Sequence, residues 1–265
     1  MLRILLRSKL TYVLLVFYLL IFIWWVKIFI SGVKISDENY LFGLVYAFIA
    51  LIGGVNGLLI SKKWGGYKSL VGKGIIFLSF GLLSYWFGQV AWSYYNLVLK
   101  VELPYPSIAD IGYFAAILFY IAGMYTFARV SGAKLILNKL KGKLISFIIP
   151  ASMLAISYFL FLQHISPDFS NIIKTFLDFG TPVGYTIVIS MALTAYFLTR
   201  GVLGGKMKNR VLYIILALIV QNITDNTFLY QAGAGIYYNA GINDFMFATS
   251  FTVMSIALIM FKNYD

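Results

Sequence analysis

The chain has 265 residues, of which 61% are hydrophobic and only 11% are charged. Soluble domains carry about 25% charged residues, so this composition excludes an ordinary soluble fold and predicts an integral membrane protein. The net charge of +12 does not indicate nucleic-acid binding, because membrane topology accounts for the positions of the basic residues. The sequence contains no cysteine, which excludes disulfides, a thiol nucleophile and cysteine metal ligands.

Eight apolar segments follow one another along the chain. Each is long enough to cross a bilayer, which takes about 20 residues of α-helix. The segments cover residues 11–30, 41–60, 74–99, 109–129, 144–163, 176–199, 211–230 and 243–261. We therefore expect an all-α fold, a polytopic membrane helix bundle of eight transmembrane helices, with no cofactor and no metal site.

Basic residues are concentrated in alternate connections between these segments. Most lie at the N-terminus, at Lys262 and in residues 61–73, 129–143 and 200–210. The other connections and the adjoining helix halves contain every acidic residue except Asp265, and the four remaining lysines, Lys27, Lys34, Lys100 and Lys174. Loops rich in Lys and Arg stay in the cytoplasm. The pattern predicts a multi-pass protein of the cell membrane with both termini in the cytoplasm.

Two stretches of the chain resemble each other. Each begins with a Gln inside one apolar segment, passes through a short loop with tyrosines, and reaches an Asp at the start of the next segment. Gln89 and Gln221 are 132 residues apart, and Asp110 and Asp244 are 134 residues apart. We expect an internal duplication, with residues 1–129 and 130–265 as two four-helix repeats. An even number of helices in each repeat makes the repeats parallel in the membrane.

The third apolar segment has polar residues on one face of its helix. Gln89, Trp92 and Asn96 are spaced at i, i+3 and i+7, so their side chains lie on the same side. An amide in hydrocarbon costs several kcal/mol if it is unpaired, so Gln89 should face protein or water. The face is either an interhelical hydrogen-bonding surface that fixes packing or one wall of a pocket open to the outer side.

The seventh segment contains the densest polar run within any apolar segment, residues 221–226. Gln221 and Asp225 are i, i+4 neighbours, and Asn222 and Asn226 lie beside them. A carboxylate inside a membrane is a candidate functional group because burying its charge is expensive. We expect Asp225 to be hydrated, hydrogen-bonded to these amides, or protonated.

Asp110 and Asp244 each stand at the start of a returning helix, where a carboxylate either caps free backbone N–H groups or faces a wet cavity. Capping is the favoured interpretation for Asp244. Tyr113 follows Asp110 by one helical turn. The candidate ligand-binding residues are therefore Gln89, Trp92, Asn96, Asp110, Tyr113, Gln221, Asn222, Asp225 and Asp244.

Three features resemble a known group of proteins: Trp92, the sequence LPYPSIADIGYFAA at residues 103–116, and ITDNTFLYQAGAGIYYNAGINDFMF at residues 223–247. They are similar to the N-terminal membrane-sensor region of bacterial and archaeal signalling proteins, where it precedes diguanylate cyclase, phosphodiesterase or histidine kinase modules. The resemblance implies a membrane sensor-like module. Since this chain ends at Asp265 without such a module, we expect it to signal through a separate protein or as a homo-oligomer.

A second resemblance is to the eight-helix lysoplasmalogenase family of lipid hydrolases, carried by Asp225 in ITDNTFL. It implies a catalytic role for Asp225. Gly88 and Gln89 stand where that family has its other membrane carboxylate, which argues against acid–base hydrolysis. The favoured hypothesis is thus a non-enzymatic module that binds a small molecule or lipid. The alternatives are a lipid hydrolase that uses Asp225 and a small-solute transporter.

Overall fold

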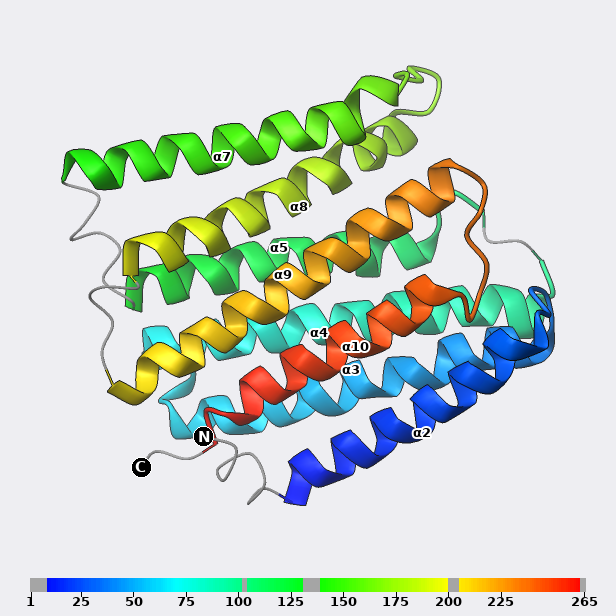
Figure 1. Cartoon of the computed structure of the whole chain (residues 1–265), viewed down its shortest axis with the longest axis horizontal. Helices are drawn as coiled ribbons and strands as arrows, with labels where there is room; N and C mark the ends of the chain where they lie inside the picture. Colours follow the sequence, from blue (N-terminus) through cyan, green and yellow to red (C-terminus); the bar gives the residue numbers. More distant parts are fainter. Residues whose placement is uncertain (1–8, 102–103, 131–138, 200–204, 263–265) are drawn as a thin grey trace.

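The computed structural model describes residues 9–101, 104–130, 139–199 and 205–262. Within these ranges the chain is all-helical, as expected (Figure 1). The long helices are α2 (Lys9–Ser31), α3 (Asp37–Lys63), α4 (Leu70–Tyr94), α5 (Ile108–Val130), α7 (Leu140–Leu160), α8 (Ile172–Thr199), α9 (Gly205–Gly233) and α10 (Ile242–Ile259). The short ones are the 3₁₀ helices η1 (Gly66–Lys68) and η3 (Leu162–His164) and the π-helical turn η2 (Tyr95–Leu99), which extends α4.

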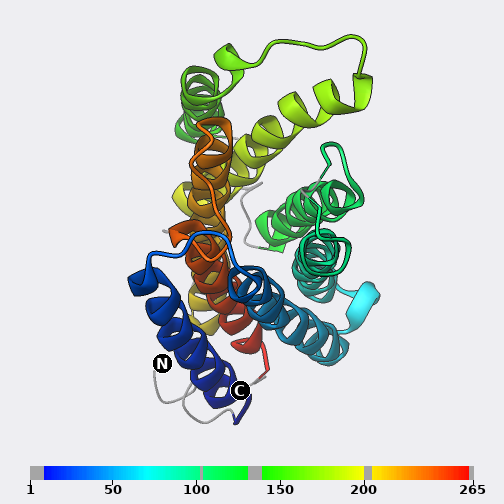
Figure 2. The ribbon, with the colours of Figure 1, turned by 90° about the vertical axis from the view of Figure 1, so that its right-hand side faces the viewer.

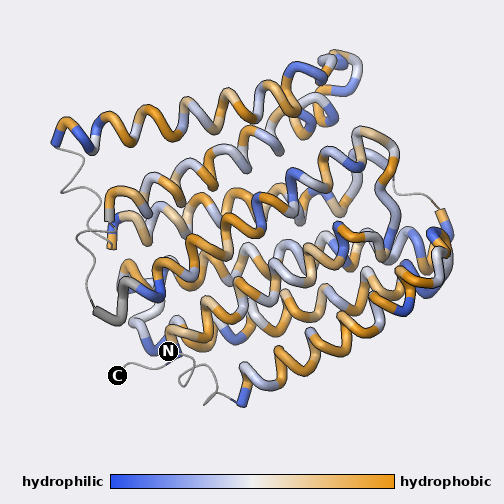
Figure 3. Tube along the Cα trace, viewed as in Figure 1, coloured by the Kyte–Doolittle hydropathy of each residue, from blue (hydrophilic) through white to orange (hydrophobic). Residues whose placement is uncertain are grey.

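Eight of the described helices are long and apolar enough to cross a membrane, so the predicted number of spans is confirmed. Apolar residues dominate most of the helix lengths and hydrophilic residues gather towards the helix ends, except in α9, whose polar run at residues 221–226 lies well inside the helix (Figure 3). This distribution places the polar connections at the two ends of the bundle, where water is available to solvate them.

Local sequence accounts for where the helices begin. The Ser36 hydroxyl accepts a hydrogen bond from the backbone N–H of Asn39 and caps α3, and Ser69 caps α4 through Gly72 N–H. In α3 the first turn contains Asp37 and Glu38, which interact favourably with the positive end of the helix dipole. Such caps satisfy N–H groups that have no partner within the helix.

Six helices form a closed ring in which each contacts the next: α3, α4, α5, α8, α9, α10 and back to α3. The other two lie outside this ring. Helix α2 packs on α3 and α10, and α7 packs on α8 (Figure 2). Helix α7 is the least buried of the eight, which is consistent with an outer position facing lipid. The interior of the ring is therefore the place where a site can be shielded from lipid.

A ladder of glycines and aromatic rings joins α4 and α5, and we call it the glycine–ring ladder. Gly74, Gly81 and Gly88 of α4 recur every seven residues, and each faces an aromatic ring of α5, in the order Phe127, Tyr120 and Tyr113. A Cβ atom on Gly81 would lie 2.2 Å from Tyr120 Cε1, and one on Gly88 would lie 2.7 Å from Tyr113 Cε1. Small residues allow membrane helices to approach closely, so the ladder sets the spacing and register of this antiparallel pair.

The GGVNG sequence of α3 has a similar role. A Cβ atom on Gly53 would lie 1.8 Å from Ser255 Oγ of α10, and one on Gly57 would lie 2.1 Å from Ser79 Oγ of α4. Both distances are far below van der Waals contact, so only glycine fits. These glycines explain how α3 packs between two neighbours at once.

One end of the ring, which we call the closed end, contains the start of α2 and the end of α10 (Figure 1). Here Trp64 donates from Nε1 to the Phe261 carbonyl at 2.7 Å, and Arg210 donates from Nε to the Met260 carbonyl at 3.1 Å. The Arg210 guanidinium also lies over the rings of Trp64 and Phe261. The Phe127 ring contacts Phe261 from α5. This packing fills the ring interior at the closed end.

Candidate functional site: a cavity inside the helix ring

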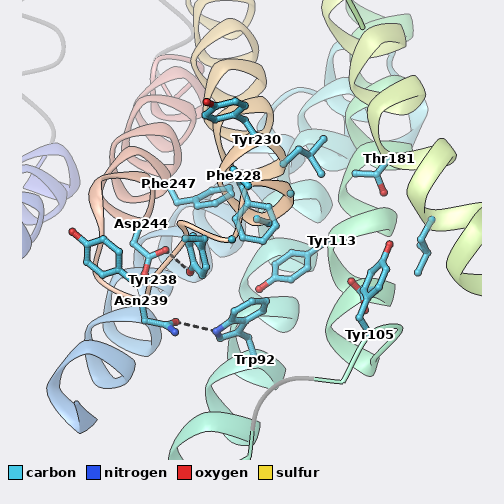
Figure 4. Close-up of a pocket in the computed structure, with 18 of the residues that line it drawn as sticks. Trp92, Tyr105, Tyr113, Thr181, Phe228, Tyr230, Tyr238, Asn239, Asp244 and Phe247 are labelled. Atoms are coloured by element: carbon cyan, nitrogen blue, oxygen red, sulfur yellow. Dashed lines mark hydrogen bonds between the residues drawn. The ribbon is translucent and has the colours of Figure 1, made fainter. Parts of the chain in front are cut away.

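A cavity of about 1740 Å³ opens at the opposite end of the ring, which we call the cavity end. Its walls come from α3, α4, α5, α8, α9 and α10, together with the connections at this end, and Leu160 at the end of α7 and His164 of η3 also line it (Figure 4). Tyr46 and Tyr85 line its deepest part, and they lie nine and fourteen residues from the cavity ends of α3 and of α4 with η2. At 1.5 Å per residue, the cavity extends about 14–21 Å into the bundle. That depth is about half the hydrocarbon thickness of a bilayer.

Aromatic rings make up one wall of the cavity. Trp92 of α4 lies edge-to-face against Phe228 and Tyr237, with ring centroids 6.2 and 5.9 Å apart. Phe228 in turn contacts Tyr237 at 5.0 Å and Phe247 at 6.2 Å. We call these four residues the aromatic wall. The indole Nε1 of Trp92 donates to Asn239 Oδ1 at 3.0 Å, which holds the ring in place (Figure 4).

The glycine–ring ladder positions a polar pair beside this wall. Because Gly88 leaves room for it, the Tyr113 ring packs directly on α4, and its hydroxyl donates to Gln89 Oε1 at 2.9 Å. Both residues line the cavity. Asn96 also lines it, but its amide donates to the Trp92 carbonyl of its own helix at 3.0 Å. Gln89 therefore both joins two helices and forms part of the wall, so both interpretations of this face apply.

A buried carboxylate lies just behind the base of the cavity. Asp225 is 2% exposed, and both of its carboxylate oxygens lie 3.0 Å from the Tyr85 hydroxyl, which donates to them. Gln221 Nε2 donates to Asp225 Oδ1 at 2.9 Å, while Gln221 Oε1 accepts from the Ser250 hydroxyl at 2.5 Å. Tyr185 of α8 adds a further interaction with the same carboxylate. Tyr85 and Tyr185 both line the cavity, so they separate Asp225 from it.

A second buried carboxylate, Asp244, forms part of the cavity wall itself. Its two oxygens accept hydrogen bonds from the Tyr237 hydroxyl at 2.8 Å and the Ala240 N–H at 2.7 Å. The backbone bond reaches Ala240, which precedes the N-cap residue Gly241, so Asp244 ties the preceding connection to α10 and does not cap an N–H of the helix itself as the sequence favoured. Burial, and then the neighbouring carboxylate, raise the pKa of Tyr237 above its ordinary value. Tyr237 therefore stays protonated and remains the donor in this pair.

Asp110 is a helix cap that also faces the cavity. The backbone N–H and hydroxyl of Ser107 donate to Asp110 Oδ2 at 2.6 and 2.9 Å. At the rim, Asp178 accepts from the Tyr105 hydroxyl at 2.7 Å and from Lys174 Nζ at 3.1 Å. Burial and the Asp178 carboxylate raise the pKa of Tyr105, so this phenol also remains a donor. Asp110 therefore both caps α5 and forms part of the cavity surface.

The structure brings together six of the nine sequence-derived residues on the cavity surface: Gln89, Trp92, Asn96, Asp110, Tyr113 and Asp244. The other three belong to the polar layer behind it. Asp225 and Gln221 are linked to the cavity through Tyr85, and Asn222 donates from Nδ2 to the Tyr185 carbonyl at 3.2 Å. The amides of α9 are thus used for packing between helices.

The sequence interpretation missed several wall residues, chiefly Tyr85, Tyr185, Phe228, Tyr237 and Asn239. Tyrosine and phenylalanine are so frequent in this chain that no single one stands out. One usable signal was present: the seven-residue spacing of the three α4 glycines is matched by an equal spacing of aromatic residues in α5. It identifies the face of α4 that packs on α5.

Comparison with known protein families, characterised proteins and solved structures found no match for this chain. The geometry of the cavity is therefore the basis for the function that we propose.

Proposed function

We propose that this protein is a membrane sensor-like module that binds a small molecule or lipid in the cavity and signals through a separate partner. The observation that carries the proposal is the cavity itself, which is about 1740 Å³ in volume and is lined by aromatic rings with a few polar groups among them. Ligand sites are typically concave, mostly apolar and lined by a small number of orienting polar groups. The volume exceeds the usual range of about 300–1,000 Å³ for small-molecule pockets, which suits an elongated amphiphile.

The proposal also includes the orientation of the cavity in the membrane. The basic residues of the sequence favour a cytoplasmic location for the closed end, so the cavity would open on the outer side. A ligand arriving from outside or from the outer leaflet would enter between the rim residues and reach the aromatic wall. The packed closed end would then face any signalling partner in the cytoplasm.

The proposed internal repeat is supported by the way the helices pair. In each half the four helices are neighbours in chain order: α2–α5 in the first and α7–α10 in the second. The last helix of each half packs on the second helix of the other, α5 on α8 and α10 on α3. Two parallel repeats related by an axis along the membrane normal would produce this reciprocal pairing. We propose that the cavity lies between two such halves, residues 1–129 and 130–265.

Ligand binding is favoured over lipid hydrolysis by Asp225 for a geometric reason. A general acid or base must come within hydrogen-bonding reach of the reacting atom. Asp225 lies behind Tyr85 and Tyr185, and its oxygens already accept from Tyr85 and Gln221. Gln89, the residue at the place of the second acid, bonds to Tyr113. Neither position offers a free carboxylate to a substrate.

Photo-labelling tests the proposed site. The purified protein in lipid nanodiscs would be exposed to an uncharged fatty alcohol and a lysophosphatidylcholine that carry a photoactivatable diazirine, and the labelled residues mapped by mass spectrometry. We expect labels on the aromatic wall, and we expect Trp92→Ala to reduce them. Phe159→Ala, on the exposed face of α7, is the matched control and should leave cavity labelling unchanged. Labels confined to outward-facing residues would refute binding in the cavity.

The signalling part of the proposal has a separate readout. If ligand binding is transmitted, hydrogen exchange at the closed-end connection between α3 and α4 should change when the probe occupies the cavity. A bound probe with no change at the closed end would argue for a binding protein that does not signal.

A further inference from the structure

The cavity and the layer behind it contain carboxylates that no cationic side chain balances. Asp110 and Asp244 line the cavity, and Asp225 lies behind its base. In the described part of the chain, none of the three forms an ion pair with Lys, Arg or His. Asp225 and Asp244 are 2% and 0% exposed. A buried carboxylate is costly without a counter-charge, so its surroundings favour a positive group or a proton.

The lysines at the cavity rim do not supply this counter-charge. Lys100 pairs with Asp37 at 2.5 Å, and Lys174 pairs with Asp178 at 3.1 Å. All four side chains are at least partly exposed, so these pairs belong to the surface of the bundle. Each of these two lysines is thus balanced by its own carboxylate. Lys34, a third lysine that lines the cavity, lies over the Tyr238 ring and forms no ion pair with Asp110, Asp225 or Asp244 among the described residues.

The aromatic wall favours the same sign of charge. The faces of aromatic rings carry partial negative charge and attract cations, most strongly on Trp and Tyr. The protein already places one cation on a ring that lines the cavity, since Lys34 Nζ lies 5.3 Å from the centroid of the Tyr238 ring. Trp92 and Tyr237 stand nearly perpendicular to each other, at 88°. The two rings are in direct edge-to-face contact, so a cation would meet only the ring faces that the partner ring does not cover.

The polar layer behind the cavity has unused hydrogen-bonding capacity. The Tyr120 hydroxyl is buried, with the residue 2% exposed, and it has no hydrogen-bond partner within the described residues. It lies close enough to Asp225 to interact with it electrostatically, and its ring packs against that of Tyr85 at 5.9 Å. An oxygen of this kind calls for an explanation, and a buried water provides one.

From these observations we infer that the cavity takes a lipophilic organic cation, a molecule in which an ammonium group is joined to an apolar body. The apolar body would pack among the rings, and the positive group would lie where the carboxylates and ring faces meet. This inference rests on the proposed ligand-binding function and names its ligand class. Fatty acids and other anionic amphiphiles would be repelled by the same carboxylates.

Three probes that share a phenylbutyl group test the inference. They are 4-phenylbutyltrimethylammonium, its uncharged isostere with a tert-butyl group, and 5-phenylpentanoate. Binding would be measured by equilibrium dialysis with the protein in phosphatidylcholine nanodiscs, and protein-free nanodiscs would be subtracted. We expect the cation to bind about tenfold more tightly than its neutral isostere, in line with a desolvated cation–ring contact. The anion should bind more weakly than both.

Substitutions then identify the residues that cause the preference for the cationic probe. Asp244→Asn and Asp225→Asn preserve side-chain shape and should lower affinity for the cation while leaving affinity for the isostere unchanged. The control is Asp168→Asn, because Asp168 accepts hydrogen bonds from Ser170 in the connection before α8 and does not line the cavity. Lys34→Met removes the resident cation from Tyr238 and should strengthen binding of the ammonium probe. Misfolding cannot mimic such a gain.

The outcomes separate the two proposals. If none of the three probes binds and no photo-label enters the cavity, the proposed function itself fails. If the neutral or anionic probe binds as tightly as the cation, the binding function stands and the charge inference is overturned. That result would mean that the buried carboxylates are protonated rather than balanced by a ligand.

Discussion

The helix pairs α4–α5 and α8–α9 show how this bundle is both packed and hollow. In the α4–α5 pair three glycines accept three aromatic rings at seven-residue intervals, and the two helices pack extensively along their length. Helix α9 has glycine only at its two ends, and it packs on α8 less extensively. A polar contact joins this second pair, with the Asn222 amide donating to the Tyr185 carbonyl.

The difference explains where the cavity forms. Helix α8 does have glycines, but Gly180 and Gly184 face Phe114 and Ile117 of α5 and not α9. The glycines of α8 thus allow close contact on the side that faces α5, and α8 packs less extensively on α9. Side chains larger than glycine hold helix backbones further apart. The space between such helices is filled by side chains, by water or by a ligand. Glycine placement along α4 therefore also sets the position of Tyr113, a residue of the cavity wall.

The largest effect on stability is expected when a glycine of the glycine–ring ladder is replaced by a larger residue. In Gly81→Ala the new methyl group would lie 2.2 Å from the Tyr120 ring, and a ring held between helices cannot move aside cheaply. We expect a loss of about 1–3 kcal/mol in the free energy of unfolding, measured by reversible denaturation in detergent micelles. Gly233→Ala is the control, since no atom lies within 4 Å of its added methyl group. Equal stability of the two variants would show that the ladder does not hold the pair.

The next largest effect concerns the contact between the first half of the chain and Asp225. Tyr85→Phe removes the hydroxyl that donates to both carboxylate oxygens. An intramolecular hydrogen bond contributes about 0.5–1.5 kcal/mol, and more when its acceptor is charged, so stability should fall by about 1 kcal/mol or more. A double-mutant cycle with Asp225→Asn measures the coupling. Additive effects would mean that the two side chains act independently.

The polar contact within the second pair should matter less than the ladder. Asn222→Ala removes the amide that reaches the Tyr185 carbonyl. Interhelical hydrogen bonds in membranes contribute about 0.6 kcal/mol on average, so we expect a loss of about 0.5–1 kcal/mol. Thermal unfolding in nanodiscs can measure it. A loss larger than that of Gly81→Ala would reverse the ranking of the two pairs.

The smallest effect is expected at the rim. Lys100 and Asp37 form an ion pair with side chains that are 55% and 75% exposed. Exposed pairs contribute about 0–1 kcal/mol and are screened by salt. Lys100→Met should change stability within that range, and the change should shrink when salt is raised from 50 mM to 0.5 M. A salt-independent loss would point to a structural role for this lysine.

Some features of the site can be predicted from the chain because their cost is local. Burying the side chains of Gln89 and Asp225 in hydrocarbon costs free energy wherever the rest of the molecule lies. Their residue types alone therefore mark them as residues that need partners. Asp110 precedes a run of apolar residues, and its capping bond from Ser107 N–H depends only on neighbours in the chain. These predictions need no knowledge of which helices meet.

The helical content and the eight spans likewise follow from apolar length, because a backbone in lipid must satisfy its own hydrogen bonds within each segment. Six helices from both halves of the chain close into a ring, and this arrangement determines which aromatic rings surround the cavity. It also places Tyr85 between the cavity and Asp225. Contacts between α4 and α9 join residues 140 positions apart, and their geometry arises from glycine notches and side-chain volumes acting together across several helices. No local pattern carries that information.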